Sequence, residues 1–422
     1  KANTTAANNT ALGRKSLQAN TTGTNNVAVG LNALFSNTTG ASNTAVGLSA
    51  LETATTADSN TAIGFEALKD NTTGTENVAV GQLALTNNTT GDENTAVGRY
   101  SLGTNTTGEK NTALGHSTVE NNTTGDFNVG IGHGALQANT TADNNTAVGY
   151  QSLDANTDGH SNTAVGKGSL GANTTGDQNT AVGYNAGTAN TTGAENVAVG
   201  YGALQTNTTA TKNVAVGLQA LNSTTTGYQN LAVGRRAGLS NTTGNNNVLV
   251  GHCAGHNITE GGQNINIGGN TTVASATASY SLVIGYNIVG KGANTGYIAP
   301  DGTSSSGIYQ GNNSSSWATT SDKRIKKNIV DNTTGLDKIN QIQIRNFEYR
   351  KEDEITELPK HSAIEKSGIQ IGVIAQEIET ILPDVVTEES TGVKSVDPSN
   401  LTWYLINAIK ELKAEIDELK KG

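Results

Sequence analysis

The sequence predicts a mainly β protein, a trimeric parallel β-roll or solenoid of 17-residue coils followed by a small α+β domain that ends in a coiled-coil helix. A glycine recurs every seventeen residues from Gly13 to Gly285, and the composition changes abruptly near residue 320. Each repeat also contains a short stretch with the alternation of a β-strand. We expect a shaft at 1–290, a Ser/Gly/Asn-rich connector at 291–320 and a C-terminal domain at 321–422.

The shaft follows from the unvarying repeat. Its consensus is N-T-A-V-G-x-x-A-L-x-x-N-T-T-G-x-x, and we number these positions one to seventeen. Spacing without a single insertion indicates stacked coils, because loops between independent elements would tolerate changes of length. Seventeen coils spaced by about 4.8 Å predict a shaft on the order of 80 Å long.

Within a coil, positions two and four should face one side of a short strand and the alanine at position three the other. Asn, Thr and Gly supply turn chemistry. No proline precedes Pro300, which fits a ladder that needs every strand N–H. A Val and a Leu per coil make a thin interior against a backbone entropy of about 1–2 kcal/mol per residue. We therefore expect other copies of the chain to cover the alanine face.

Composition excludes several classes of protein. The chain has 36 Asp and Glu against 26 Lys and Arg, and its basic residues are scattered through the repeats, which argues against nucleic-acid binding. No apolar stretch approaches the roughly 20 residues that cross a bilayer, so we expect no membrane insertion. The single cysteine, Cys253, allows no intrachain disulfide. Because residue 1 is Lys and the chain has no Met, we expect an attachment region to precede it.

The C-terminal hundred residues have ordinary strand and helix patterns. Apolar residues at alternating steps of four and three predict the seam of a short coiled coil at Leu405, Ile409, Leu412, Ile416 and Leu419. The alternative is a surface helix that packs on its own domain. The heptads alone do not establish a trimer.

Four motifs resemble one family. Trp317 to Ile329 (WATTSDKRIKKNI), Phe347 to Tyr349, Gly372 to Glu377 and a final Ala-Ile-Lys-Glu-Leu helix resemble the autocleaving intramolecular chaperone of endosialidase tailspikes and phage tail fibres. The resemblance implies a domain that drives trimerisation of the fibre and then cuts itself off. One departure is Pro398, which follows Val396 and Asp397 where related domains often carry Tyr.

Carried over to this sequence, the resemblance implies a cleavage site at Thr320–Ser321, with Ser321 as nucleophile and Lys326 as the base of a serine-lysine dyad. Asp322 and Arg324 would have orienting or structural roles. Such a base must be a neutral amine, which burial or neighbouring cations favour. The alternative is that SDKRIKK is a solvated charged turn.

The repeats have a second resemblance. N-T-A-V-G-x-x-A is similar to the coil of the left-handed parallel β-roll heads of trimeric autotransporter adhesins, whose unit is three residues shorter. This resemblance also implies a homotrimer.

Position six forms a variable stripe, the position-six stripe, because stacking aligns it from coil to coil. It mixes aromatic and basic residues that could contact a glycan or a protein receptor, including Arg99, His133, Tyr150, Tyr184 and Tyr201. The alternative is a packing edge between chains or a solvated rim. His252, Cys253 and His256 match no established zinc spacing, so we expect no metal and no cofactor.

Together these observations predict a trimeric fibre shaft for host-surface attachment, located in a virion tail fibre or at a cell surface, whose partner is a host receptor. The only enzymatic activity expected is a single self-cleavage in cis. The alternative function is an ice-binding solenoid, since Thr at positions two, thirteen and fourteen could form regular arrays. A third hypothesis is that the peptidase activity of the C-terminal domain is the protein's main function.

Overall fold

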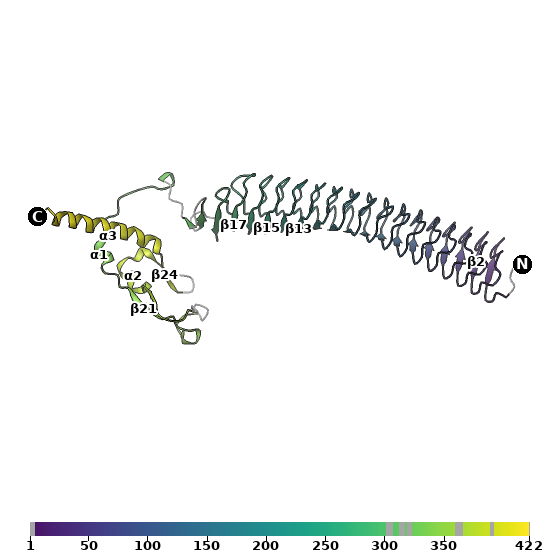
Figure 1. Cartoon of the computed structure of the whole chain (residues 1–422), viewed down its shortest axis with the longest axis horizontal. Helices are drawn as coiled ribbons and strands as arrows, with labels where there is room; N and C mark the ends of the chain where they lie inside the picture. Colours follow the sequence, from purple (N-terminus) through teal and green to yellow (C-terminus); the bar gives the residue numbers. More distant parts are fainter. Residues whose placement is uncertain are drawn as a thin grey trace. The chain divides into compact units, whose positions relative to one another are not determined.

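The computed structural model describes residues 5–300, 307–311, 317–318, 323–358, 366–388 and 392–421. The chain divides into two compact units, Lys1–Thr320 and Ser321–Gly422. The first is mainly β and the second is small and carries the helices (Figure 1).

The first unit is a parallel β-solenoid in which each coil contributes one short strand. Each strand from β1 to β16 pairs in register with the strand seventeen residues later, as Ala28 pairs with Ala45. The strands of the repeats are β1 (Thr10–Leu12), β2 (Val27–Val29), β3 (Thr44–Val46), β4 (Thr61–Ile63), β5 (Val78–Val80), β6 (Thr95–Val97), β7 (Thr112–Leu114), β8 (Val129–Ile131), β9 (Thr146–Val148), β10 (Thr163–Val165), β11 (Thr180–Val182), β12 (Val197–Val199), β13 (Val214–Val216), β14 (Leu231–Val233), β15 (Val248–Val250), β16 (Ile265–Ile267) and β17 (Leu282–Gly285). The predicted solenoid of 17-residue coils is confirmed.

The sheet continues past the last repeat. β18 (Gly296–Ala299) pairs with β17 in parallel, and β19 (Ile308–Gln310) and β20 (Trp317–Ala318) follow as antiparallel strands. Tyr297 on β18 is buried in a small cluster with Val283 and Ile288. The segment that we expected to be a connector therefore extends the sheet in part.

The interior of the solenoid consists of small side chains facing leucine. Ala28 at position three, Ala33 at position eight and Leu34 at position nine are all fully buried, and the same positions form one continuous core along the unit. We expected other chains to cover the alanine face, and this prediction was wrong. The alanines point into the coil's own core, because its narrow interior accepts only a small side chain opposite each leucine.

The glycine at position five is required by the close approach of successive coils. Gly81 has φ +137°, and a Cβ there would lie 2.6 Å from the carbonyl oxygen of Gly98. That conformation is favourable only for glycine, and that distance is below any real Cβ contact. The strict period of seventeen follows from this contact.

Two columns of buried asparagine run along the solenoid. At position one, the Asn111 side chain accepts a hydrogen bond from the backbone N–H of Asn128 (2.9 Å) and donates to the carbonyl of Gly125 (2.8 Å). At position twelve, the Asn105 amide donates to Asn88 Oδ1 (2.8 Å) in the preceding coil. The asparagines predicted to make turns therefore also tie each coil to the next.

The described part of the second unit contains two short antiparallel pairs and three α-helices. Its elements are η1 (Lys323–Ile325), α1 (Leu336–Ile339), β21 (Arg345–Phe347), η2 (Glu352–Glu354), β22 (Gln370–Gly372), α2 (Ala375–Ile381), η4 (Pro383–Val385), β23 (Val386–Glu388), β24 (Lys394–Val396) and α3 (Pro398–Leu419). β21 pairs with β22, and β23 pairs with β24. Ile378, Leu382 and Val385 form its core.

The long helix α3 begins at Pro398, the residue at which the sequence departs from the related domains. Proline is well suited to the first turn of a helix, where its missing N–H has no intrahelical acceptor. Within the described residues, no helix has the length and apolar character needed to cross a membrane.

Candidate functional sites

The structure describes residues on both sides of the predicted cleavage junction, but not the junction itself. Thr320, Ser321 and Asp322 lie outside the described residues. Arg324 lies in η1, and the backbone N–H of Lys326 donates to the carbonyl of Lys323 at 3.2 Å. The dyad of Ser321 and Lys326 therefore stays a prediction.

Lys326 lies in an exposed basic stretch of the second unit. Its neighbours in the sequence, Lys323, Arg324 and Lys327, are exposed as well in the single chain. The described residues therefore include the predicted base and the basic residues around it, but not the nucleophile.

Three side chains of α3 make polar contacts that hold the helix on its own unit. The Tyr404 hydroxyl donates to Asp384 (2.6 Å), the Asn407 amide donates to the carbonyl of Asn332 (2.8 Å), and Glu411 accepts from the backbone N–H of Leu336 (2.6 Å). The hydrogen bond to Asp384 is the main cause of a raised pKa of Tyr404, with burial as the next. These contacts fix one side of α3.

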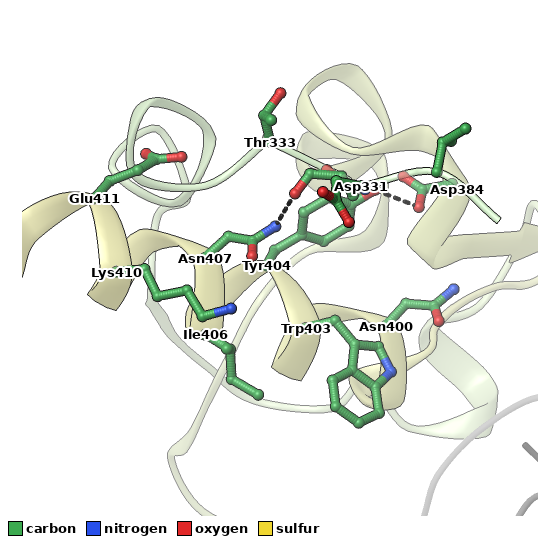
Figure 2. Close-up of a pocket in the computed structure, with 12 residues that line it drawn as sticks. Asp331, Thr333, Asp384, Asn400, Trp403, Tyr404, Ile406, Asn407, Lys410 and Glu411 are labelled. Carbon is green, nitrogen blue, oxygen red and sulfur yellow. Dashed lines mark hydrogen bonds between the residues drawn. The ribbon is translucent and has the colours of Figure 1, made fainter.

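An open cleft of about 840 Å³ lies along this side of α3. Figure 2 shows Tyr404 and Asn407 pointing toward the segment of Asp331 and Thr333, whereas Trp403 points away from that segment. Acidic, basic and amide side chains all line the cleft. This mixed lining matches no catalytic constellation that the sequence predicted.

The predicted coiled-coil seam is exposed in the single chain. Relative exposure is 43 % at Leu405, 66 % at Ile409, 46 % at Leu412, 42 % at Ile416 and 82 % at Leu419. The helix does pack on its own unit, as the alternative prediction proposed, but it uses another face. That face carries Leu401, Tyr404 and Ala408, so the seam faces solvent.

The position-six stripe forms a continuous ladder over seven coils. We call the position-six side chains from Arg99 to Tyr201 the ladder. The rings of His116 and His133 stack with centroids 5.1 Å apart, and those of His133 and Tyr150 stack at 5.4 Å. Of the residues predicted for surface binding, the structure therefore places His133 and Tyr150 in direct contact.

The ladder continues through Lys167. Its ammonium lies 5.6 Å from the ring centroid of Tyr150 and 5.7 Å from that of Tyr184, which in turn stacks on Tyr201 at 5.3 Å. At the other end, the Arg99 guanidinium lies 4.5 Å from the Tyr100 ring, whose edge meets His116. The sequence predicted the column, but not the role of Tyr100 at position seven.

The histidines near Cys253 form local contacts. The His252 ring lies 2.8 Å from an Arg235 guanidinium nitrogen and 3.6 Å from the Cys253 sulfur, while the His256 ring bonds the Cys253 carbonyl at 2.9 Å. Among the described residues there is no group of three or more side chains of the types that hold metal ions.

Comparison with known proteins identifies one domain. Residues 321–387 match the family model described as the chaperone of endosialidase. No curated protein and no solved structure matches the chain significantly. The match starts at Ser321, which is also the first residue of the second compact unit. The chain therefore consists of a seventeen-turn parallel β-solenoid followed by a C-terminal domain of the endosialidase-chaperone type.

Proposed function

We propose that the chain is the shaft of a homotrimeric fibre that attaches to a host surface, and that its C-terminal domain aligns three chains and then cuts itself off once at Thr320–Ser321. The observation that carries this proposal is the endosialidase-chaperone match directly behind a repeating solenoid. The family is associated with trimerisation and autocleavage in tail-fibre-like proteins. The place of action would be a phage tail fibre or another extracellular fibre.

The repeat itself creates a need for a template. Neighbouring strands such as β5 and β6 differ little in sequence, and both pair by the same seventeen-residue offset. Chains that associate along such a surface can slip by a whole coil with little change in contacts. A domain that aligns the chains at one end would suppress these slipped assemblies.

The outer face of the strands is the surface that three chains would share. Positions two and four point away from the alanine core, and their apolar side chains are partly exposed along the unit. Leu114 is 48 % exposed, Ile131 36 % and Val182 38 %. A long apolar stripe of this kind marks an interaction surface in a soluble protein. Because the stripe repeats with the same period as the chain, another copy of the chain matches it.

The seam of α3 supports the same assembly. Its exposed leucines and isoleucines have coiled-coil spacing, and an adjacent face of the helix is already bonded to its own unit. Three such helices could bury their seams against one another without losing the contacts that hold each helix.

The self-cleavage is tested by the denatured mass of wild type beside Ser321→Ala and Lys326→Gln. We expect the wild-type chain to be cut before Ser321 and both variants to stay intact as folded trimers. Lys327→Gln is the matched control, because it removes the same charge from an adjacent lysine that is not predicted to be the base. It should be cut like wild type.

Two results would contradict this part of the proposal. An intact wild-type chain in a folded trimer would remove the dyad and leave the alignment role standing. Equal inhibition by the substitutions at Lys326 and Lys327 would show that local positive charge, and not a specific base, supports the cut.

The second candidate is an ice-binding solenoid, favoured by one exposed row of threonine at position fourteen, such as Thr107 and Thr124. The row at position thirteen is less available, since the Thr106 hydroxyl donates to the carbonyl of Thr123 (2.9 Å). Position two is Thr in some coils and Val, Leu or Ile in others, so it forms no unbroken threonine row. Thermal hysteresis of the wild-type protein would favour this candidate, and its absence would favour the fibre.

A further inference from the structure

Acidic and basic residues are unevenly distributed over the positions of the coil. Residues 1–320 contain 17 Asp and Glu residues, none of them at position six, against 11 Lys and Arg residues, four of which stand there. These four are Arg14, Arg99, Lys167 and Arg235. An acidic chain thus keeps one longitudinal stripe free of negative side chains. This distribution of charge indicates that the position-six stripe binds an anionic ligand.

The ladder concentrates this character over seven successive coils. It is accessible in the single chain, with relative exposures of 48 % for Tyr150, 43 % for Tyr184 and 53 % for Tyr201. From His116 to Tyr201 each rung is in ring or cation–π contact with its neighbours, and Arg99 is joined to this stack through Tyr100, so the side chains are ordered before a ligand arrives. Such order lowers the entropic cost of binding.

The geometry of the stack decides which polymer fits. The ring planes of His116 and His133 differ by 8°, and those of Tyr184 and Tyr201 by 9°, so ring faces cover one another. Single-stranded nucleic acids bind by stacking their bases on open ring faces. The ladder therefore presents ring edges to a ligand. The polar groups on these edges are the tyrosine hydroxyls and the histidine ring nitrogens, and the lysine ammonium and arginine guanidinium groups lie in the same column.

These donors recur at the coil spacing of about 4.8 Å along a straight column. A linear polymer that carries carboxylates and hydroxyls at regular intervals would engage several rungs at once, and each additional contact becomes effectively intramolecular. We propose that the ladder from Arg99 to Tyr201 binds a linear acidic polysaccharide lying along the shaft. This deepens the attachment role proposed above by naming its ligand class and its site.

The test measures binding of the full-length wild-type protein to immobilised alginate, a linear polyuronate, at low salt. The ladder variant is Arg99→Glu with Lys167→Glu. The matched control is Lys110→Glu with Lys212→Glu, which makes the same change of charge at position seventeen, outside the ladder. We expect the ladder variant to bind at least about tenfold more weakly and the control to stay within about twofold of wild type.

A second variant separates ligand contact from a structural role of the stack. Tyr184→Phe with Tyr201→Phe keeps both rings and removes only their hydroxyls. We expect alginate binding to fall several-fold while the native mass and circular dichroism spectrum stay as in wild type. An unchanged affinity would show that the hydroxyls do not contact the polymer and would overturn the proposed mode of binding.

Three further results would overturn the inference. They are no binding of wild type to alginate, equal loss in the ladder variant and the control, and single-stranded DNA binding more tightly than alginate with the same dependence on Arg99 and Lys167. Neutral dextran should not bind. A wild-type protein that forms trimers but ignores alginate would overturn this inference and leave the fibre proposal intact.

Discussion

Replacing Asn111 by alanine tests the claim that the buried asparagine column at position one holds successive coils together. Asn111 is fully buried and makes three side-chain hydrogen bonds, to the N–H of Asn128, the carbonyl of Gly125 and Oδ1 of Asn94. The Gly125 carbonyl keeps a second donor, the amide of Asn122 at 2.9 Å. The alanine variant therefore leaves one buried backbone N–H, that of Asn128, without a partner.

The expected loss of stability follows from the backbone N–H of Asn128, which is left without a hydrogen-bond partner. An unsatisfied buried donor costs about 1–3 kcal/mol, and each lost hydrogen bond contributes about 1 kcal/mol net. We expect Asn111→Ala to lower the local stability of its coil by about 2–4 kcal/mol. In a solenoid such a loss stays near the substitution, because each coil contacts only its neighbours.

Asn122→Ala is the matched control from the second column. The Asn122 side chain bonds Asn105, Asn139 and the Gly125 carbonyl, but it caps no backbone N–H. The Gly125 carbonyl keeps Asn111 as a donor. We expect a loss of about 1–2 kcal/mol, which agrees with the presence of Ala54 at the same position of another coil.

Hydrogen exchange measured by mass spectrometry is the suitable assay, because it reports the opening of individual coils. The peptide that contains the Asn128 amide should exchange about tenfold faster in Asn111→Ala than in Asn122→Ala, at equal protein concentration. Equal acceleration in both variants would refute the reasoning, since it would mean that cavity formation and not the orphaned N–H sets the cost.

Three further predictions concern other parts of the molecule. Ser59 is exposed and has φ +60°, and this left-handed conformation costs a non-glycine residue about 1–2 kcal/mol. Ser59→Gly should therefore raise the free energy of unfolding by about 0.5–1 kcal/mol after the entropy cost of glycine is subtracted. A lower melting temperature of the variant would contradict this. Because the hydrogen bond to Asp384 raises the pKa of Tyr404 above its ordinary value of 10.0, its contribution to stability is present below pH 10 and is lost as pH rises through the higher folded value. Denaturant titrations at increasing pH should show this loss in wild type but not in Tyr404→Phe, and identical profiles would exclude the contact. Leu412→Asp with Ile416→Asp places charges in the α3 seam and should prevent trimer formation in sedimentation experiments, while a stable trimer would show that the seam is not buried.

Much of the solenoid could be predicted from the sequence because its period reflects a backbone contact. A side chain at position five would overlap the backbone of the next coil. A glycine that recurs every seventeen residues therefore predicts coils stacked at that spacing. The alternation of Val27, Ala28 and Val29 specifies two faces but not which is interior. That depends on the width of the coil, which is set by the turns and not by the strand itself.

Other features could not be read from residue types alone. Asparagine is a common turn residue, so the burial of both columns follows only from the coil geometry. Leucine at position nine, such as Leu34 with φ +50°, adopts a conformation that its side chain disfavours. Its burial in the core compensates for that strain. For the C-terminal domain, the motifs identified the family, but the dyad requires the position of Ser321.

The native mass of the wild-type protein, measured by native mass spectrometry with its denatured mass alongside, tests the central claim most directly. We expect an assembly of three chains, about 130 kDa for three uncut chains of 43.2 kDa each, or three shafts if the C-terminal domains have been cut off and released. A folded species of one chain, with the outer strand face and the α3 seam both open to solvent, would contradict it.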